Sequence, residues 1–225
     1  MAELFLVRHG QASIESDNYD QLSSLGHQQA RWLGEYFAER GLVFDRIITG
    51  QMVRHRETAE GVLAGFGKPS FALETTADWD EFDFDRLISQ FLTEYPTFRL
   101  ADDVPRSARY GLLKQALEHW AAGKLQGELP ESWAEFEGRL TRQLDTLQSQ
   151  SSREKVLVIS SGGAIAMALR LILMSPASMM VKLNLQTRNA SLSHCYFNSG
   201  GFSLSSFNAV PHLDTPERRE LISYF

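Results

Sequence analysis

The stretch Leu4-Phe5-Leu6-Val7-Arg8-His9-Gly10 places an arginine and a histidine directly after a short apolar run. A brief apolar run of this kind is typical of a strand that is covered on both faces of a parallel sheet. In open α/β sheets, ligands bind at the carboxyl ends of the strands. The stretch therefore predicts a buried strand over residues 4–7 and a candidate site where that strand ends.

Two further apolar runs, at 46–49 and 156–160, have the same character, and a segment with helical periodicity follows each of the three runs. After the first run, apolar residues recur on one helix face, between a residue suited to cap the helix and a glycine suited to end it. They are Ala30, Leu33 and Phe37, with Ser23 before them and Gly41 after them. The third run leads into an apolar helix expected over 164–174. This alternation predicts an α/β fold: a three-layer α/β/α sandwich with a mainly parallel central sheet.

The middle of the chain has helical patterns without clear strand signals. Apolar residues recur on helix faces around residues 80–130, and we expect this segment to form a helical insertion over one edge of the sheet. An apolar stripe from Trp133 to Leu147 predicts a further helix, and two β-rich runs at 193–198 and 202–208 predict a hairpin. The chain contains no repeat or long linker, so residues 1–225 are expected to form a single domain.

The composition limits the classes of function. Hydrophobic residues make up 43% of the 225 residues, which is enough for a full core. Twenty-two basic and 28 acidic residues leave a net charge of −6, which disfavours nucleic acid as a partner. The single cysteine, Cys195, excludes an intramolecular disulfide and a multi-cysteine metal site, and it suits a reducing cytoplasm.

We expect neither a targeting segment nor a membrane span. The apolar run 4–7 follows Glu3 and is too short for the hydrophobic region of a signal peptide. The apolar stretch 164–174 is interrupted by Arg170 and is too short to cross a bilayer. The sequence therefore predicts a soluble, cytoplasmic protein with no membrane partner.

Arg8 and His9 together suggest chemistry on an anion. An imidazole at a strand end can act as a nucleophile, and the adjoining guanidinium can hold an anion with its planar set of donors. A surface arginine–histidine pair in a loop is the alternative interpretation, and the tripeptide alone leaves both open.

Several other segments share one family pattern with this tripeptide, in the same order along the chain. They are Arg8-His9-Gly10-Gln11-Ala12-Ser13, residues 22–30, residues 49–54 with Glu57-Thr58-Ala59-Glu60, Trp79-Asp80-Glu81-Phe82-Asp83-Phe84, Pro130-Glu131-Ser132 with Phe136 and Arg139, Asn189-Ala190-Ser191, and residues 208–213. The set resembles the histidine phosphatase superfamily, with its phosphoglycerate-mutase-like fold, over nearly the whole chain.

The resemblance implies a role for each matching residue. His9 is the nucleophile that becomes phosphorylated, Arg8 and Arg54 neutralise the phosphoryl oxygens, and Glu81 protonates the leaving alcohol. Fixed cations and backbone N–H groups suit this chemistry because phosphoryl transfer spreads negative charge over the oxygens. Desolvation by neighbouring aromatic residues would raise the pKa of Glu81. The alternative is that Glu81 is one of several acids on a solvated loop.

The third strand departs from the family pattern. The family usually ends this strand in Ser-His-Gly-Gly, with the histidine as a second phosphate ligand, whereas this chain has Ser160-Ser161-Gly162-Gly163. We expect the hydroxyl of Ser161 and the helix start at Gly162 to bind phosphate. By analogy with lost oxyanion donors, the missing histidine predicts a rate lower by up to about 10²–10³-fold.

The remaining histidines are expected to take no part in the chemistry. His55 is expected to cap or cover a helix start, with a position leaning into the pocket as the alternative. His27 and His119 are expected to lie at the surface, and His212 to make a structural hydrogen bond. None has metal-ligand spacing with another histidine or cysteine, so the sequence predicts no metal and no cofactor.

These observations predict a phosphomonoesterase that hydrolyses a small-molecule phosphate ester through a phosphohistidine on His9. A weak or inactive phosphate-binding protein is the alternative that Ser161 raises, and a phosphoglycerate mutase is the third interpretation. The substrate and the oligomeric state stay open.

Overall fold

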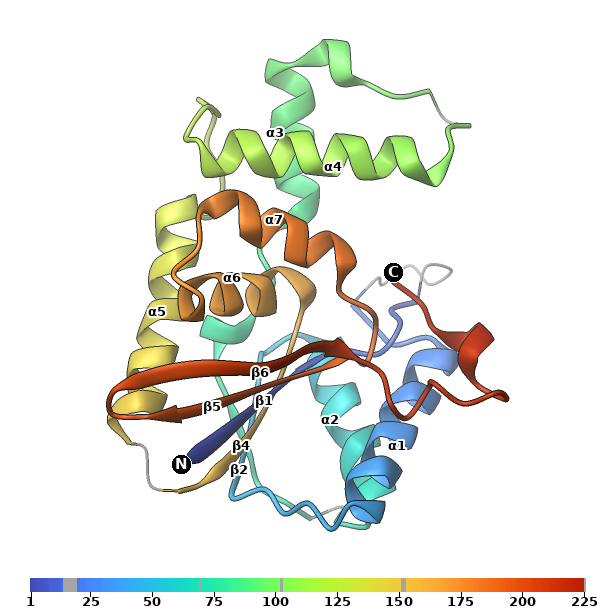
Figure 1. The fold of residues 1–225 in the computed structure, drawn as a ribbon. Coiled ribbons are helices and arrows are strands. Elements are labelled where there is room, and N and C mark those ends of the chain that lie inside the picture. Colours follow the sequence, from blue (N-terminus) through green and yellow to red (C-terminus); the bar gives the residue numbers. More distant parts are fainter. Residues whose placement is uncertain (14–19, 69, 102, 151–152, 225) are drawn as a thin grey trace.

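The structure is a computed structural model that describes residues 1–225 except 14–19, 69, 102, 151–152 and 225. The side chain of Arg106 is also outside the described part. Within the described residues, the chain forms a six-stranded sheet with helices on both faces (Figure 1). No helix in this part of the chain is long and apolar enough to cross a membrane.

The sheet has the strand order β3-β2-β4-β1-β5-β6. The strands are β1 (Ala2–Arg8), β2 (Arg46–Thr49), β3 (Leu73–Thr75), β4 (Lys155–Ser160), β5 (Leu192–Asn198) and β6 (Gly201–Ala209). The first four strands are parallel to one another, whereas β5 pairs antiparallel with β1 and β6 antiparallel with β5. The prediction of an α/β sandwich with a mainly parallel sheet is confirmed.

One face of the sheet is covered by α1 (Ser24–Glu39) and α2 (Val53–Phe66). Ser23 caps α1 as predicted, because its side chain accepts a hydrogen bond from the N–H of Gly26. The apolar face of α1 packs with the strand residues that point to this side, and all of them are buried: Leu33 and Phe37 from the helix, and Phe5, Val7 and Ile159 from the strands.

The other face is covered by α5 (Trp133–Ser149), α6 (Gly162–Ile172) and α7 (Ala177–Gln186). The alternate strand residues, among them Leu4, Leu6 and Val158, point to this side and form one buried cluster with these helices. Helix α6 is buried along most of its length, which explains why its sequence is nearly all apolar.

The segment 80–130 forms α3 (Phe84–Glu94), the 3₁₀ turn η2 (Pro96–Phe98) and α4 (Arg106–Ala121). Helix α4 packs against α7, so this segment lies on the outside of the α6–α7 layer (Figure 1). The single domain over residues 1–225, with this segment as an insertion, stays a prediction.

One strand and one α-helix of the described chain were not predicted from the sequence. Strand β3 is only three residues long and half exposed, and α7 follows α6 after a short turn at Ser175-Pro176. Helix α6 begins at Gly162 and ends at Ile172, two residues before the expected start and end. The hairpin of β5 and β6 is confirmed.

The parallel strands end side by side, and this positions the candidate site. Arg8 at the end of β1 pairs with Ser160 at the end of β4, and Thr49 at the end of β2 pairs with Ile159. The backbone N–H of His9 donates to the carbonyl oxygen of Ser160 over 2.9 Å. The segments that follow β1, β2 and β4 therefore begin at one edge of the sheet.

Candidate active site

His9 follows β1 and is buried, with 4% of its surface exposed. Its Nδ1 lies 2.6 Å from the carbonyl oxygen of Gly10, a distance that requires Nδ1 to carry the proton and donate it. Nε2 then holds a free lone pair. Burial, and after it the positive charges of Arg54 and Arg8, lower the pKa of His9 well below its ordinary value. The ring is therefore neutral at neutral pH and has the form that a nucleophile needs.

The loop that carries His9 is fixed by close packing on α1. A Cβ built on Gly10 would lie 2.4 Å from the carbonyl oxygen of Gly26 in the first turn of α1, so only glycine fits there. The N–H of Gly10 donates to Thr58 Oγ1 over 3.1 Å, and the N–H of Gln11 donates to Gln29 Oε1 over 2.9 Å. These contacts hold the imidazole in place from two helices.

Arg8 is the last residue of β1 and is almost completely buried. Its Nη1 donates to the carbonyl oxygen of Tyr224 over 2.8 Å and also to the carbonyl oxygen of Thr187. A Cβ built on Gly162 would lie 3.5 Å from Arg8 Nε and 2.7 Å from Asn184 Oδ1. Arg8 is therefore held beside the N-terminus of α6, where the helix dipole also favours an anion.

Arg54 lies in the first turn of α2 and is held by an acid from the loop before α1. Its Nη1 forms an ion pair with Asp20 Oδ1 at 2.9 Å, and Asp20 Oδ2 accepts from the N–H of Val53 over 2.9 Å. Nη2 of Arg54 reaches Ser161 Oγ at 3.5 Å. The guanidinium groups of Arg8 and Arg54, from different elements, both lower the pKa of His9 through their positive charge.

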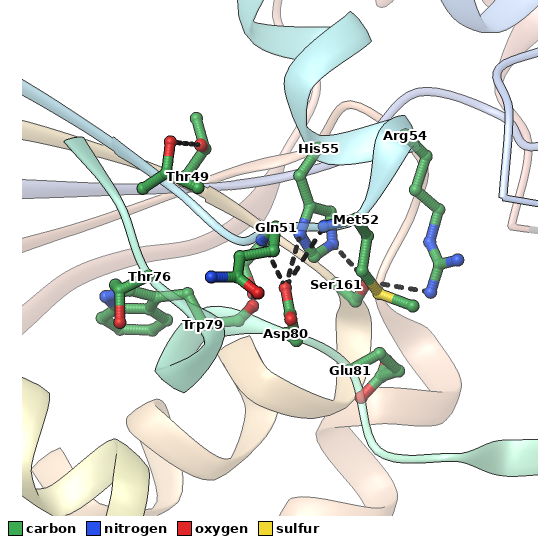
Figure 2. Close-up of polar contacts among 12 residues, drawn as sticks. Thr49, Gln51, Met52, Arg54, His55, Thr76, Trp79, Asp80, Glu81 and Ser161 are labelled. Carbon is green, nitrogen blue, oxygen red and sulfur yellow. Dashed lines mark hydrogen bonds and ion pairs between the residues drawn. The ribbon is translucent and has the colours of Figure 1, made fainter. Parts of the chain in front are cut away.

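Ser161 is the N-cap residue of α6, but its side chain makes no capping hydrogen bond. Its Oγ instead lies 2.7 Å from Nε2 of His55, which is fully buried (Figure 2). Nδ1 of the same ring lies 3.7 Å from Asp80 Oδ1. The expectation that His55 caps or covers the start of α2 is therefore wrong, because the N-cap position is Met52. The imidazole points into the site, which is the alternative that the sequence left open.

Glu81 follows the 3₁₀ turn η1 (Ala77–Trp79), and its carboxylate meets the start of α6. Its Oε2 accepts from the N–H of Gly163 over 2.8 Å. Burial raises the pKa of Glu81, and the hydrogen bond from Gly163 opposes this rise. A carboxyl group in these surroundings can hold a proton at a higher pH than an exposed glutamate does. It does not lie on a solvated loop.

Three hydrogen bonds from two side chains fix the segment that carries Asp80 and Glu81. Ser160 Oγ at the end of β4 donates to the carbonyl oxygen of Trp79 over 2.5 Å. Arg139 from α5 donates through Nη1 to the carbonyl oxygens of Asp78 and Asp80, over 2.7 Å each. The segment is thereby attached to β4 and α5, and this attachment sets the position of Glu81.

All six residues singled out in the sequence lie around this one edge of the sheet: Arg8, His9, Arg54, Glu81, Ser161 and Gly162. Sequence reasoning gave a position of His55 in the pocket only as the alternative, and it missed Asp80, Asp20 and Asn184. One signal was available for the pocket position of His55, because the tripeptide Val-Arg-His occurs twice. Residues 7–9 lie at the end of β1, and residues 53–55 follow β2 by a few residues.

The remaining histidines differ from one another. His27 is more than half exposed, as expected. His119 is half-buried and packs against Phe91 and Tyr95, so the expectation of a surface position is wrong. His212 is buried, and within the described residues neither of its ring nitrogens has a hydrogen-bond partner, which contradicts the expected structural hydrogen bond. No group of three or more histidine, cysteine or acidic side chains in the described part of the chain is placed to hold a metal ion.

Solved structures with this fold include enzymes of two kinds. A phosphoglycerate mutase from Bacillus anthracis aligns with a TM-score of 0.71 and 18% identity, covering 94% of each chain. A phosphoserine phosphatase from Entamoeba histolytica, in complex with phosphoserine, aligns with a TM-score of 0.66 and 20% identity, covering 95% of this chain and all of that one. At these identities the likeness concerns the fold.

The sequence itself is similar to that of a protein from Serratia proteamaculans named "Probable phosphoglycerate mutase GpmB". The two are 26% identical over 234 residues, which cover 98% of this chain and 99% of the relative. The family model of the histidine phosphatase superfamily (branch 1) matches residues 4–210. The chain therefore belongs to the histidine phosphatase superfamily, branch 1.

Proposed function

We propose that the protein is a phosphomonoesterase that hydrolyses a small phosphate ester through a phosphohistidine on His9. The observation that carries the proposal is the state of His9: a neutral, buried imidazole whose Nδ1 is engaged by Gly10, between two arginines. This arrangement leaves Nε2 as the attacking atom. The arginines supply the positive charge that a phosphoryl group needs when it is transferred.

In the first step, His9 Nε2 attacks the phosphorus atom, and the bond from phosphorus to the ester oxygen breaks. Arg8 and Arg54 hold the phosphoryl oxygens, and the leaving oxygen takes the proton of Glu81. The raised pKa of Glu81 favours this role, because the carboxyl group must be protonated before the step.

In the second step, the Glu81 carboxylate takes a proton from a water molecule, whose oxygen attacks the phosphorus of the phosphohistidine. The bond from phosphorus to Nε2 breaks, inorganic phosphate is released, and Glu81 is protonated again. The two arginines can carry the phosphoryl charge in both steps, so we expect turnover without added divalent metal ions.

The test compares the wild-type protein with His9→Ala on a panel of small phosphate esters, with inorganic phosphate as the readout. We expect release by the wild type and none above background by the variant. A brief reaction quenched in base should also leave an acid-labile phosphoryl group on His9 in a peptide mass map. Equal release by both proteins would overturn the proposal.

Two rivals give different results on the same samples. A weak or inactive phosphate-binding protein, which the serine at position 161 favours, would bind phosphate and release none from any ester. A phosphoglycerate mutase, which the similarity to the Serratia protein favours, would interconvert 2- and 3-phosphoglycerate faster than it releases phosphate. The partner is a small molecule in each case, and the cytoplasmic location stays a prediction.

A further inference from the structure

His55 has no assigned role in the chemistry above, yet it is one of the most deeply buried polar side chains of the molecule. Its surroundings are specific on both sides of the ring. Nε2 lies 2.7 Å from Ser161 Oγ, and Nδ1 faces Asp80 Oδ1 at 3.7 Å. Within the described residues, Nδ1 has no hydrogen-bond partner.

The position of the ring is fixed by what surrounds it. Asp80 Oδ1 accepts from the N–H groups of Gln51 and Met52, over 2.6 and 3.3 Å, which anchors the carboxylate. A Cβ built on Gly50 would lie 2.1 Å from His55 Nδ1 and 2.5 Å from Asp80 Oδ1, so these two side chains fill the space that a glycine leaves open. A larger residue at position 50 would displace both groups.

The direction of the Ser161 proton depends on this ring. A serine hydroxyl donates one hydrogen bond and accepts two. If the ring accepts from Ser161, the hydroxyl proton is used there and the serine has none to offer a ligand. If Nε2–H donates to Ser161 Oγ, and Arg54 Nη2 donates from 3.5 Å, the hydroxyl proton can point at a phosphoryl oxygen.

A bound phosphoryl group favours the second arrangement. Its negative charge attracts the serine proton, and it favours a ring that carries a proton on Nε2. The Asp80 carboxylate on the Nδ1 side further stabilises a protonated ring. Burial and the charge of Arg54 lower the pKa of His55, and the negative charge of a bound phosphoryl group would oppose this lowering.

We propose that His55 is a positioning residue that directs the hydroxyl of Ser161 at the phosphoryl group, with Asp80 behind the ring. The site thereby obtains a polarised donor from two residues on different elements, the serine at the start of α6 and the imidazole in α2. The proposal rests on the phosphoryl site of the proposed function, and it assigns no nucleophilic or acid–base step to His55.

The test is a double-mutant cycle on the affinity for inorganic phosphate, measured by isothermal titration. Ser161→Ala and His55→Leu should each weaken binding by about 3- to 10-fold, the value of one hydrogen bond. The double variant should bind about as weakly as either single variant, because both changes remove the same donor. His55→Gln should restore most of the affinity, since its amide N–H can donate to Ser161.

A matched control separates this role from the general effect of removing a histidine. His194 in β5 is half-buried, stacks on Phe5 and contacts Glu3 near the opposite end of β1. His194→Leu should leave phosphate affinity unchanged. Any one of three results would overturn the proposal. The losses of the two single variants multiply in the double variant, His55→Leu binds phosphate like the wild type, or His55→Gln binds phosphate no better than His55→Leu.

A second measurement uses the unaltered protein. In crystals soaked with orthovanadate, Ser161 Oγ should lie within about 3 Å of a vanadate oxygen while it keeps its contact with His55 Nε2. A hydroxyl turned away from the anion would refute the assignment. Because these readouts measure binding, they remain informative if the wild-type protein releases no phosphate from any ester or if His9→Ala releases as much as the wild type, so the two proposals fail separately.

Discussion

Gly163 is the position at which one added carbon atom should disturb the proton donor together with the ring of Phe82 beside it. A Cβ built there would lie 2.2 Å from Glu81 Oε1 and 2.5 Å from Phe82 Cε1, far inside van der Waals contact. In Gly163→Ala, the carboxyl group therefore has to move by about 1 Å, and a shift of this size at a reacting group can cost on the order of 10²-fold in rate. The hydrogen bond from Gly163 N–H to Glu81 is lost or weakened at the same time.

The loss should depend on the leaving group. An alkyl phosphate releases a poor leaving group that needs a proton, so kcat/KM for such an ester should fall by about 10²-fold. The p-nitrophenolate ion leaves without a proton, so kcat/KM for p-nitrophenyl phosphate should fall by only a few-fold. The assay is steady-state phosphate or nitrophenol release by both proteins at one pH.

Gly111→Ala is the matched control, because a Cβ at that position in α4 meets no atom within 4 Å. It should leave both rates unchanged and stabilise the helix slightly. An equal loss for the two esters in Gly163→Ala, or no loss, would refute the role of Glu81 as the acid.

Three further outcomes can be measured. Burial raises the pKa of Glu81 and lowers that of His9, so kcat/KM for alkyl phosphates should fall as pH rises above the pKa of Glu81, and Glu81→Gln should remove this dependence. Asp20→Asn removes the ion pair that orients Arg54 and should raise KM several-fold with little effect on the melting temperature. Burial lowers the pKa of His212 to about 3, so the unfolded chain takes up a proton that the folded chain refuses once the pH falls below about 6.5. The unfolding free energy should therefore be about 2 kcal/mol lower at pH 5 than at pH 7.5 through this residue. His212→Leu should abolish that part in urea unfolding, whereas an unchanged pH dependence would contradict it.

The sequence was informative where one strand or one helix face carries the signal. The sequences of β1, β2 and β4 are short and apolar because helices cover both faces of the sheet. This pattern predicted the parallel core. Strand β3 was missed because it is a half-exposed edge strand with little hydrophobic pattern. Helix α7 was missed because its position is set by packing on α6 and α4, which local periodicity does not encode.

The site shows the same division. Arg8, His9 and Ser161 follow strand ends, and strand ends meet by topology, so their proximity could be predicted. His55 and Asp80 come together through a contact between α2 and the segment after η1, which lie 25 residues apart along the chain. The side-chain direction of a histidine at a helix start depends on what packs beside it, here the space at Gly50. Single-sequence reasoning has no access to that space.

The place of β1 in the sheet has a consequence for how the protein reaches its folded state. This strand is made before its sheet neighbours β4 and β5, which follow roughly 150 or more residues later in the chain. The guanidinium of Arg8 also needs the carbonyl oxygens of Thr187 and Tyr224 as hydrogen-bond acceptors. His9 therefore acquires its surroundings only after the chain has been made as far as Thr187 and Tyr224, and nascent fragments that end before β5 should bind no phosphate. Contacts between segments that are far apart in sequence form slowly. During refolding, phosphate binding should therefore recover with the slowest folding phase and not with the formation of α1 and α2.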